Sequence, residues 1–317
     1  MKHSCVGGVG GDTTRRSFIG GATAFALAGM AHADDRSSEY AAWQKDIDGV
    51  TPKAYVDFQF AGTSLSDSAR AAAYAANPGL KRYDDAFARV ISDMRAVTVP
   101  PGKVAVWHIY NMGVLVKTSK TLFSVDLNHR LAESLVPELS FALITHNHTD
   151  HFSDRFLTAM DWSKKTVVSN FASNYGAHYG KKMPGGYTRE PKTFTLGDVT
   201  VKTSVSDHNS YLLGFTMPFE ITVGDYTIYH TGDTSNIAQL NPSRRPDLWI
   251  MHPYCILKIA DGIRKFNPRL TAVTHLQELG HARNQWRFTY DDGLKMVRKA
   301  QEAGGEAIMP LWGDRLV

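Results

Sequence analysis

Three histidines and one aspartate lie within six consecutive positions near the middle of the chain. The segment reads Thr-His-Asn-His-Thr-Asp-His-Phe over Thr145–Phe152 and directly follows a short apolar run. That run predicts a buried strand, so the histidines and the aspartate belong to the loop at its end. Because side chains alternate along an extended chain, His146 and His148 can project in the same direction. Asp150 and His151 follow after one residue and can face a neighbouring position, which predicts two adjacent half-sites.

Imidazole and carboxylate side chains are typical metal ligands. They suit zinc best, with manganese, iron or nickel as alternatives. A ligand-free surface cluster of histidines is the competing interpretation. The dense His-x-His-x-Asp-His pattern in one loop weakens that interpretation and favours a metal site.

The first residues of the chain predict an export signal. A pair of arginines in Thr13–Gly20, a short apolar stretch over Gly21–Met30 and the small residues Ala31–Ala33 follow one another in the order of a cleavable signal. Paired arginines followed by a phenylalanine resemble the twin-arginine signal. The apolar stretch is shorter than the roughly 20 residues that span a membrane. We therefore expect a signal peptide over residues 1–33, use of the twin-arginine export machinery, and a periplasmic or secreted protein cleaved after Ala33.

Composition excludes several classes of partner. The formal net charge is only +4 over 317 residues, so the chain lacks the basic footprint of a nucleic-acid-binding or anionic-membrane-binding protein. Of two cysteines, Cys5 lies in the expected signal, which leaves Cys255 without a disulfide partner. The sequence predicts no integral membrane segment and leaves the oligomeric state open.

The region before residue 103 has a helical pattern. Apolar positions at spacings of three and four in Leu80–Met94 predict an amphipathic helix, and an alanine-rich helix is expected over Ser68–Ala76, before Pro78. We expect a helical N-terminal extension over residues 34–102. Its apolar face is expected to pack against the main domain, with a lid over the substrate site as the alternative.

The region 103–317 has the sequence pattern of an α/β domain. Short segments rich in Val, Ile and aromatic residues, separated by turn formers, predict strands. The strand candidates are Val104–Tyr110, Gly113–Thr118, Thr121–Asp126, Phe141–Thr145, Val167–Ser169, Val199–Ser204, Phe219–Val223, Tyr226–His230, Leu248–His252 and Ala272–His275. Helix candidates are Ser153–Met160 and Asp291–Ala303. Strands in runs with helices between them predict two mixed sheets faced by helices.

The histidine motif resembles the signature of the metallo-β-lactamase-fold hydrolases, and the resemblance covers roughly residues 103–317. It implies a four-layer αββα sandwich and further ligands at the ends of later strands. The third histidine of the first metal would be His208, which follows a predicted strand; His178 is the rival and has no strand before it. An acid that bridges both metals would be Asp233, in a Gly-Asp pair after Tyr226–His230.

The resemblance also implies a histidine that completes the second metal site. His275 fits at the end of the last predicted strand, and His252 and His281 are its competitors. The implied centre thus holds two divalent ions. Its ligands are His146, His148 and His208 for one ion, Asp150, His151 and His275 for the other, and Asp233 between them.

Two adjacent metal ions lower the pKa of a shared water and stabilise charge on a developing oxyanion. Asp150 would act as a catalytic residue beyond its role as a ligand, by orienting the nucleophile or carrying a proton. Ligand imidazoles need partners on their second nitrogen, and Asp126, Asp207 and Thr231 are candidates. Each of the three is equally explained as a turn former or a polar residue at a strand end.

The resemblance implies a binuclear hydrolase of a small-molecule lactone, ester or phosphodiester, closest in look to the branch that contains L-ascorbate-6-phosphate lactonase. β-Lactamases of this fold generally lack the bridging acid, so Asp233 disfavours β-lactam cleavage. A redox or sensor protein of the same fold without hydrolase activity is the alternative. The diiron redox relatives replace a cluster histidine by glutamate, and the intact His148 favours hydrolysis. A catalytically inactive binding protein fits poorly with a complete ligand set.

Overall fold

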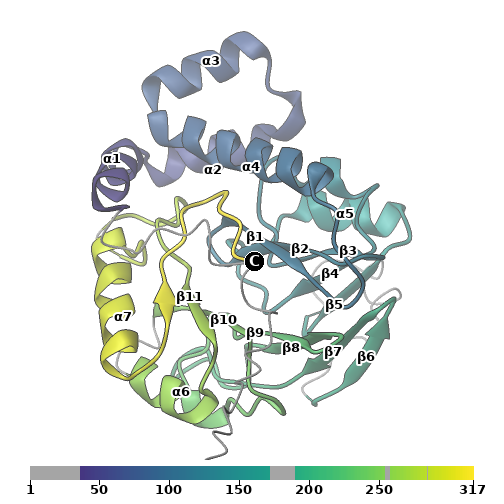
Figure 1. Cartoon of the computed structure of the whole chain (residues 1–317). Coiled ribbons are helices and arrows are strands. Elements are labelled where there is room, and N and C mark those ends of the chain that lie inside the picture. Colours follow the sequence, from purple (N-terminus) through teal and green to yellow (C-terminus); the bar gives the residue numbers. More distant parts are fainter. Residues whose placement is uncertain (1–35, 172–189, 254–257, 284) are drawn as a thin grey trace, which may run out of the picture. The chain divides into compact units, whose positions relative to one another are not determined.

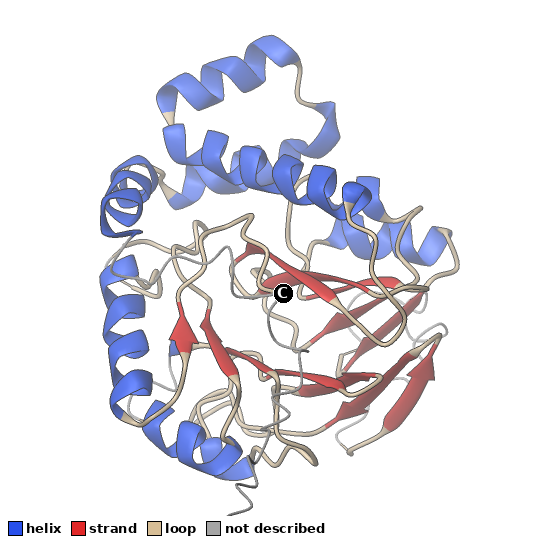
Figure 2. Ribbon diagram, in the orientation of Figure 1, coloured by secondary structure: helices blue, strands red, loops and turns tan. Residues whose placement is uncertain are grey.

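Two mixed β-sheets form the centre of the structure, and helices lie on their outer sides (Figure 2). The structure is a computed structural model that describes residues 36–171, 190–253, 258–283 and 285–317. The expected signal, His178 and Cys255 lie outside these residues. The α/β class and the two mixed sheets predicted from the sequence are confirmed. The helices and sheets belong to one compact unit, Ala31–Val317, and the expected boundary at residue 102 stays a prediction.

The first sheet has five strands in sequence order. They are β1 (Ala105–Tyr110), β2 (Gly113–Lys117), β3 (Leu122–Val125), β4 (Phe141–Ile144) and β5 (Thr166–Ser169). Antiparallel hairpins join β1 to β2 and β2 to β3, whereas β3, β4 and β5 run parallel. Nearly all of their residues are buried, which explains the continuous apolar runs in the sequence.

The second sheet has seven strands in the order β12-β11-β10-β9-β8-β7-β6. They are β6 (Thr193–Leu196), β7 (Val199–Thr203), β8 (Phe219–Val223), β9 (Tyr226–His230), β10 (Leu248–Met251), β11 (Leu270–Val273) and β12 (Ala307–Ile308). The four strands β9 to β12 are parallel, and the pairs from β6 to β9 are antiparallel. The carboxyl ends of β9, β10 and β11 therefore lie at one edge of this sheet.

Within the described residues, seven helices accompany the sheets (Figure 1). They are α1 (Ser37–Asp48), α2 (Pro52–Ala61), α3 (Asp67–Ala76), α4 (Pro78–Ala96), α5 (Asp154–Trp162), α6 (Ile259–Phe266) and α7 (Tyr290–Glu302). α5 contacts β5, and α7 contacts β11 and β12. In the described part of the chain, no helix is both long and apolar enough to cross a lipid bilayer.

The helix α4 packs its apolar face on the first sheet, as the sequence predicts. Its residues Leu80, Tyr83, Phe87, Val90 and Met94 are buried. The Tyr83 ring meets the edge of the Tyr110 ring at 4.9 Å between centroids. These contacts support packing against the main domain and give the alternative of a mobile lid no support.

Three elements were not predicted from the sequence. The edge strand β6 has only four residues and is partly exposed, and β12 has only two residues. The helix α6 has only eight residues, too few to establish a helical period.

Candidate metal centre

Strand ends bring the side chains of the centre together. Asp233 follows β9 and His275 follows β11, and both strands are parallel to the β10 that lies between them. His208 comes from the loop after β7, on the antiparallel side of the same sheet. The loop with His146 follows β4 of the first sheet. The centre therefore lies where the ends of strands from both sheets meet.

The first group of possible ligands contains His146, His148, His208 and Asp233, whose ligand atoms all lie within 4.8 Å of one another. The Nε2 atoms of His146 and His208 lie 3.7 and 3.5 Å from Asp233 Oδ2. His148 is half-buried, and the other three are buried. These are the residues that the sequence assigns to the first metal.

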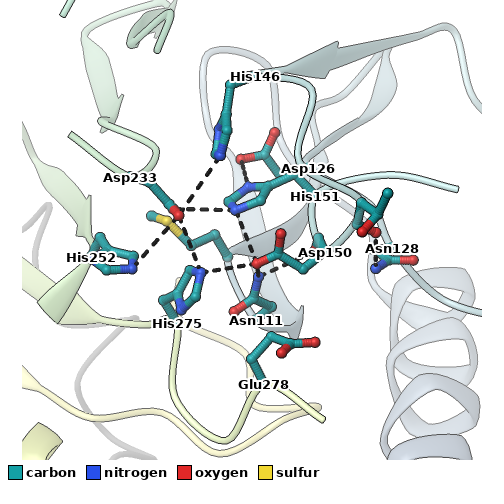
Figure 3. Close-up of polar contacts among 12 residues, drawn as sticks. Asn111, Asp126, Asn128, His146, Asp150, His151, Asp233, His252, His275 and Glu278 are labelled. Carbon is teal, nitrogen blue, oxygen red and sulfur yellow. Dashed lines mark hydrogen bonds and ion pairs between the residues drawn. The ribbon is translucent and has the colours of Figure 1, made fainter. Parts of the chain in front are cut away.

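The second group contains Asp150, His151, Asp233 and His275, again within 4.8 Å of one another and all buried. His275 Nε2 lies 3.1 Å from Asp150 Oδ2 and 3.3 Å from Asp233 Oδ2. His151 Nε2 lies 3.2 Å from Asp233 Oδ1 (Figure 3). Asp233 thus belongs to both groups: its Oδ2 lies near histidines of each group, and its Oδ1 lies near His151 of the second.

These separations fit a bound metal ion. Ligand atoms about 2.1 Å from a tetrahedral ion lie roughly 3.4 Å from one another, and the contacts within the two groups range from 3.1 to 3.7 Å. The Nε2 atoms of His146, His151 and His208 and Oδ1 of Asp233 are buried without a hydrogen-bond partner. Buried polar atoms without partners are costly, and a cation at this position would satisfy them.

Asp126 holds two of the imidazoles in one orientation. Its Oδ2 accepts hydrogen bonds from His151 Nδ1 at 2.9 Å and from the Thr145 hydroxyl at 2.7 Å. That hydroxyl accepts in turn from His146 Nδ1 at 3.0 Å. With the protons of both rings on Nδ1, the lone pairs on Nε2 point toward Asp233.

Asn111 connects the two halves of the second group. Its side-chain amide donates to Asp150 Oδ2 at 3.1 Å, and its carbonyl accepts from the backbone N–H of His275 at 2.9 Å. Positive φ angles occur at Asn111 (54°), Asp126 (48°), His275 (56°) and Gln277 (60°). Non-glycine residues adopt this region at an energetic cost, and such positions gather at functional sites.

The electrostatics of the centre favour positive charge. Burial lowers the pKa of His275, but the carboxylates of Asp233 and Asp150 outweigh it and raise this pKa to about 10. Burial likewise opposes ionisation of Asp150, yet the imidazoles of His151 and His275 hold its pKa well below the usual range. The two carboxylates therefore stay ionised and attract a cation, whether a proton or a metal ion.

The three candidates for the last ligand occupy different places. His275 lies in the second group. His252, treated as a rival, also lies at the centre: its Nε2 is 3.7 Å from Asp233 Oδ2, and its ring is 4.1 Å from that of His275. It follows β10, so it reaches the same edge of the sheet as Asp233 and His275. His281 lies outside both groups and pairs with Glu278.

Of the three residues considered as partners for ligand imidazoles, only Asp126 has that role. Asp207 accepts hydrogen bonds from the Gly214 N–H and from the amides of Asn236 and Gln239, so it shapes the loop around His208. The Thr231 hydroxyl donates to the Ile250 carbonyl.

Two residues of the centre were not predicted from the sequence. They are Asn111 and Thr145. Asn111 acts through a hydrogen bond to Asp150, 39 positions away in the sequence, and Thr145 through one to the adjacent His146. No local sequence pattern marks either residue. His252 was predicted only as a competitor of His275, at the end of the predicted strand Leu248–His252.

Comparisons with known proteins agree with this architecture. No protein-family model matches the chain. A UPF0173 metal-dependent hydrolase from Nanoarchaeum equitans is 25% identical over 190 residues, which are 55% of this chain and 83% of that protein. A UPF0173 protein from Pyrococcus abyssi is 28% identical over 126 residues, 38% of this chain and only 55% of the relative.

Solved structures similar to this one identify the fold. A possible metal-dependent hydrolase from Veillonella parvula has a TM-score of 0.51 at 14% identity, covering 67% of this chain and 98% of the other. The metallo-β-lactamase fold protein YhfI from Bacillus subtilis has a TM-score of 0.50 at 17% identity, covering 67% and 97%. This chain has the metallo-β-lactamase fold. A CmlA β-hydroxylase variant, 15% identical with a TM-score of 0.50, is covered over 53% of its length.

Within this metallo-β-lactamase fold, Asp126 offers a direct test of ligand positioning. We expect Asp126→Asn to weaken metal affinity about 10–100-fold. If the amide oxygen accepts from the Thr145 hydroxyl and His151 Nδ1, its NH₂ faces the backbone N–H of Thr145, which is also a donor. Competition with a chromophoric chelator measures the affinity. Asp198→Asn is the control, since Asp198 accepts from the hydroxyl of Thr118 outside both ligand groups. Equal affinities for the two variants would contradict the role of Asp126.

Proposed function

We propose that the protein is a metal-dependent hydrolase with a binuclear centre, acting on a lactone, ester or phosphodiester. The observation that carries the proposal is Asp233, which is shared by two groups of buried ligands. The similarity to metal-dependent hydrolases in sequence supports the reaction class. Imidazole and carboxylate donors favour zinc, with manganese, iron and nickel as alternatives.

The chain's own residues define how such a centre would work. Two divalent ions would supply Lewis acidity, lowering the pKa of a water and polarising the bond to be cleaved. Asp126 and Thr145 hold the imidazoles of His151 and His146 with Nε2 toward the centre. Asn111 holds Asp150, whose carboxylate is positioned to orient the attacking water or to take up its proton.

The alternative function is redox or sensor chemistry of the same fold. Its support is the structural similarity to a β-hydroxylase, which is limited to the fold at this identity. The three histidines of the first group, with His148 present, favour hydrolysis. Visible absorption from bound iron together with no turnover would favour the alternative.

Metal removal and substrate screening test the proposed hydrolase. We expect dialysis against a chelator to abolish hydrolysis and two equivalents of zinc or manganese to restore it. The metal-loaded protein is screened against lactones, thioesters, phosphodiesters and β-lactams, with turnover expected in the first three classes rather than the last. Binding of one equivalent or less after reconstitution would contradict the binuclear centre. Turnover unaffected by the chelator would contradict metal dependence.

Export through the twin-arginine machinery is part of the proposal. It is supported by the paired arginines Arg15 and Arg16 and the small residues before Asp34. Export of a folded protein would allow the metal to be bound before translocation. Replacing both arginines by lysine should leave the precursor uncleaved in the cytoplasm, and an unchanged distribution between cell fractions would contradict this route.

A further inference from the structure

A buried carboxylate beside the metal centre holds a histidine that is outside both ligand groups. Glu278 is 1% exposed and accepts four hydrogen bonds. Its Oε1 accepts from the Tyr110 hydroxyl at 3.0 Å and from the Gly280 N–H at 2.7 Å. Its Oε2 accepts from the backbone N–H of His281 at 2.7 Å and from the His281 ring Nδ1 at 2.6 Å. Burying a charge requires such compensation, so this carboxylate fixes the imidazole firmly.

Hydrogen bonds tie the residues around this pair to the rest of the fold. The buried guanidinium of Arg287 donates to the carbonyls of Glu278, Leu279 and His281 at 2.8–2.9 Å. The Leu279 N–H donates to the Tyr110 hydroxyl at 2.6 Å. The same guanidinium donates to the Val50 carbonyl at the start of α2. The position of the imidazole is thus set by the fold rather than by a free loop.

The pair lies next to the metal centre. Glu278 and His281 come after His275 on the loop that leaves β11, and Figure 3 shows Glu278 beside Asn111 and His275. Tyr110, which donates to Glu278, directly precedes Asn111, which donates to Asp150. The side chain of His281 is 38% exposed, so its ring borders the solvent. Within the described residues, its Nε2 forms no hydrogen bond.

The groups facing His281 favour its protonated form. The hydrogen bond to Glu278 raises the pKa of His281, burial lowers it, and the charge of Asp150 raises it further. The charge of His275 lowers this pKa. Because Glu278 holds Nδ1, the proton that can be given away is the one on Nε2.

We propose that His281, oriented by Glu278, is the proton donor for the leaving-group oxygen in the hydrolysis. The inference rests on the proposed function. The attacking oxygen forms a bond to the substrate carbonyl carbon, and the bond from that carbon to the leaving oxygen breaks. The electron pair of the broken bond stays on the leaving oxygen, which takes the proton from Nε2 of His281. The neutral imidazole then regains a proton from solvent.

A purely structural role predicts a different pattern of defects. If the Glu278–His281 hydrogen bond only stabilises the loop, removing it would slow the hydrolysis of all substrates equally and disturb the candidate metal ligand His275. A proton donor matters only where the leaving oxygen is strongly basic, because a stabilised phenolate departs without protonation. Comparing substrates with different leaving groups therefore distinguishes a proton donor from a purely structural residue.

Two lactones that differ in their leaving group provide the test. Dihydrocoumarin releases a phenolate and δ-valerolactone an alkoxide. For metal-loaded His281→Gln we expect kcat/KM to fall about 100-fold with δ-valerolactone and less than about threefold with dihydrocoumarin, the lower end of general acid catalysis. Glu278→Gln should show the same selectivity to a smaller extent. The control is Arg283→Gln. Arg283 lies on the same loop as His281, has a mostly exposed side chain and pairs with Asp48 at the end of α1, so its replacement should leave both rates unchanged.

A measurement independent of turnover accompanies the kinetics. The imidazole of His281 is titrated by NMR, with the His281→Gln spectrum identifying its signals. We expect its pKa to lie above the ordinary 6.5 in the wild type and to fall in Glu278→Gln. An ordinary value in the wild type, or equal loss of both lactone activities in His281→Gln, would overturn the inference while leaving the hydrolase intact. Wild-type protein that turns over neither lactone would contradict lactone hydrolysis itself and the donor role with it.

Discussion

Asp233→Ala is expected to reduce hydrolysis by at least about 10³-fold, equivalent to about 4 kcal/mol of transition-state stabilisation. The reason is that both ligand groups share this carboxylate: Oδ2 lies 3.5 Å from His208 Nε2, and Oδ1 lies 3.2 Å from His151 Nε2. Its removal takes one ligand from each ion and leaves a cluster of imidazoles with less negative charge to balance two divalent cations. We expect the metal content after reconstitution to fall from two equivalents to one or less.

Metal analysis and kinetics on the same preparations separate loss of metal from loss of fold. Asp225→Ala is the matched control, because Asp225 precedes the same β9 strand and is fully exposed at the β8–β9 turn. It should keep two metal equivalents and the wild-type rate. Circular dichroism should show the same secondary structure for both variants. An Asp233→Ala protein that binds two ions and retains its rate would remove this residue from the mechanism.

The candidate ligands could be picked out from the sequence because their main signals are local. His146, His148, Asp150 and His151 lie in one loop after a strand with a clear apolar pattern. The candidate ligands Asp233 and His275 come shortly after β9 and β11, and parallel strands place the residues beyond their carboxyl ends at one edge of a sheet. His208 comes from the loop after β7. The same rule explains why the predicted set of candidate ligands was incomplete. The sequence analysis treated His252 as a rival of His275, whereas β10 lies between β9 and β11 and brings His252 to the same edge of the sheet.

The supporting residues could not be predicted because they act over long sequence separations. Tyr110 and Glu278 are 168 positions apart and meet only when β1 and the loop after β11 are both in place. Asn111 contacts Asp150 across 39 positions. Such contacts depend on tertiary packing, and neither periodicity nor turn signals in one sequence report it. Polar residues in these places are indistinguishable from ordinary turn formers until the fold is known.

In the helical extension, too, the sequence pattern predicts the buried apolar residues but not the buried polar ones. Its apolar spacing predicted which face of α4 is buried, but that spacing says nothing of polar residues on the same face. Asp84 lies there, 7% exposed in its side chain, and its carboxylate accepts from Arg130 Nε at 2.9 Å. The extension is also connected to the loop after β4, which carries His146 to His151. The Gln59 amide donates to the Asn128 side chain, and the Asn128 amide donates to the Thr149 carbonyl. The extension therefore supports the loop between His148 and Asp150.

Breaking the ion pair of Asp84 with Arg130 is expected to cause the largest loss of stability. In Asp84→Ala the guanidinium of Arg130, 3% exposed, would remain buried without its carboxylate. It would keep the Gly62 carbonyl as an acceptor and the face of the Phe58 ring, 4.6 Å from its central carbon. Removing one partner of a buried pair costs about 3–5 kcal/mol, much more than the pair contributes relative to apolar residues. Urea unfolding of the metal-loaded protein measures the change in the free energy of unfolding.

The neighbouring residue provides the control. Asp85 is also an aspartate of α4 that pairs with a basic residue, but its side chain is 61% exposed and its partner Lys81 is 56% exposed. Solvent screens such a pair, so Asp85→Ala should cost less than about 1 kcal/mol. The double variant Asp84→Ala with Arg130→Met should recover much of the loss, because it removes the unpaired charge and fills the space with an apolar side chain. A loss of similar size in Asp84→Ala and Asp85→Ala would show that burial of the Arg130 pair does not determine the stability of the extension.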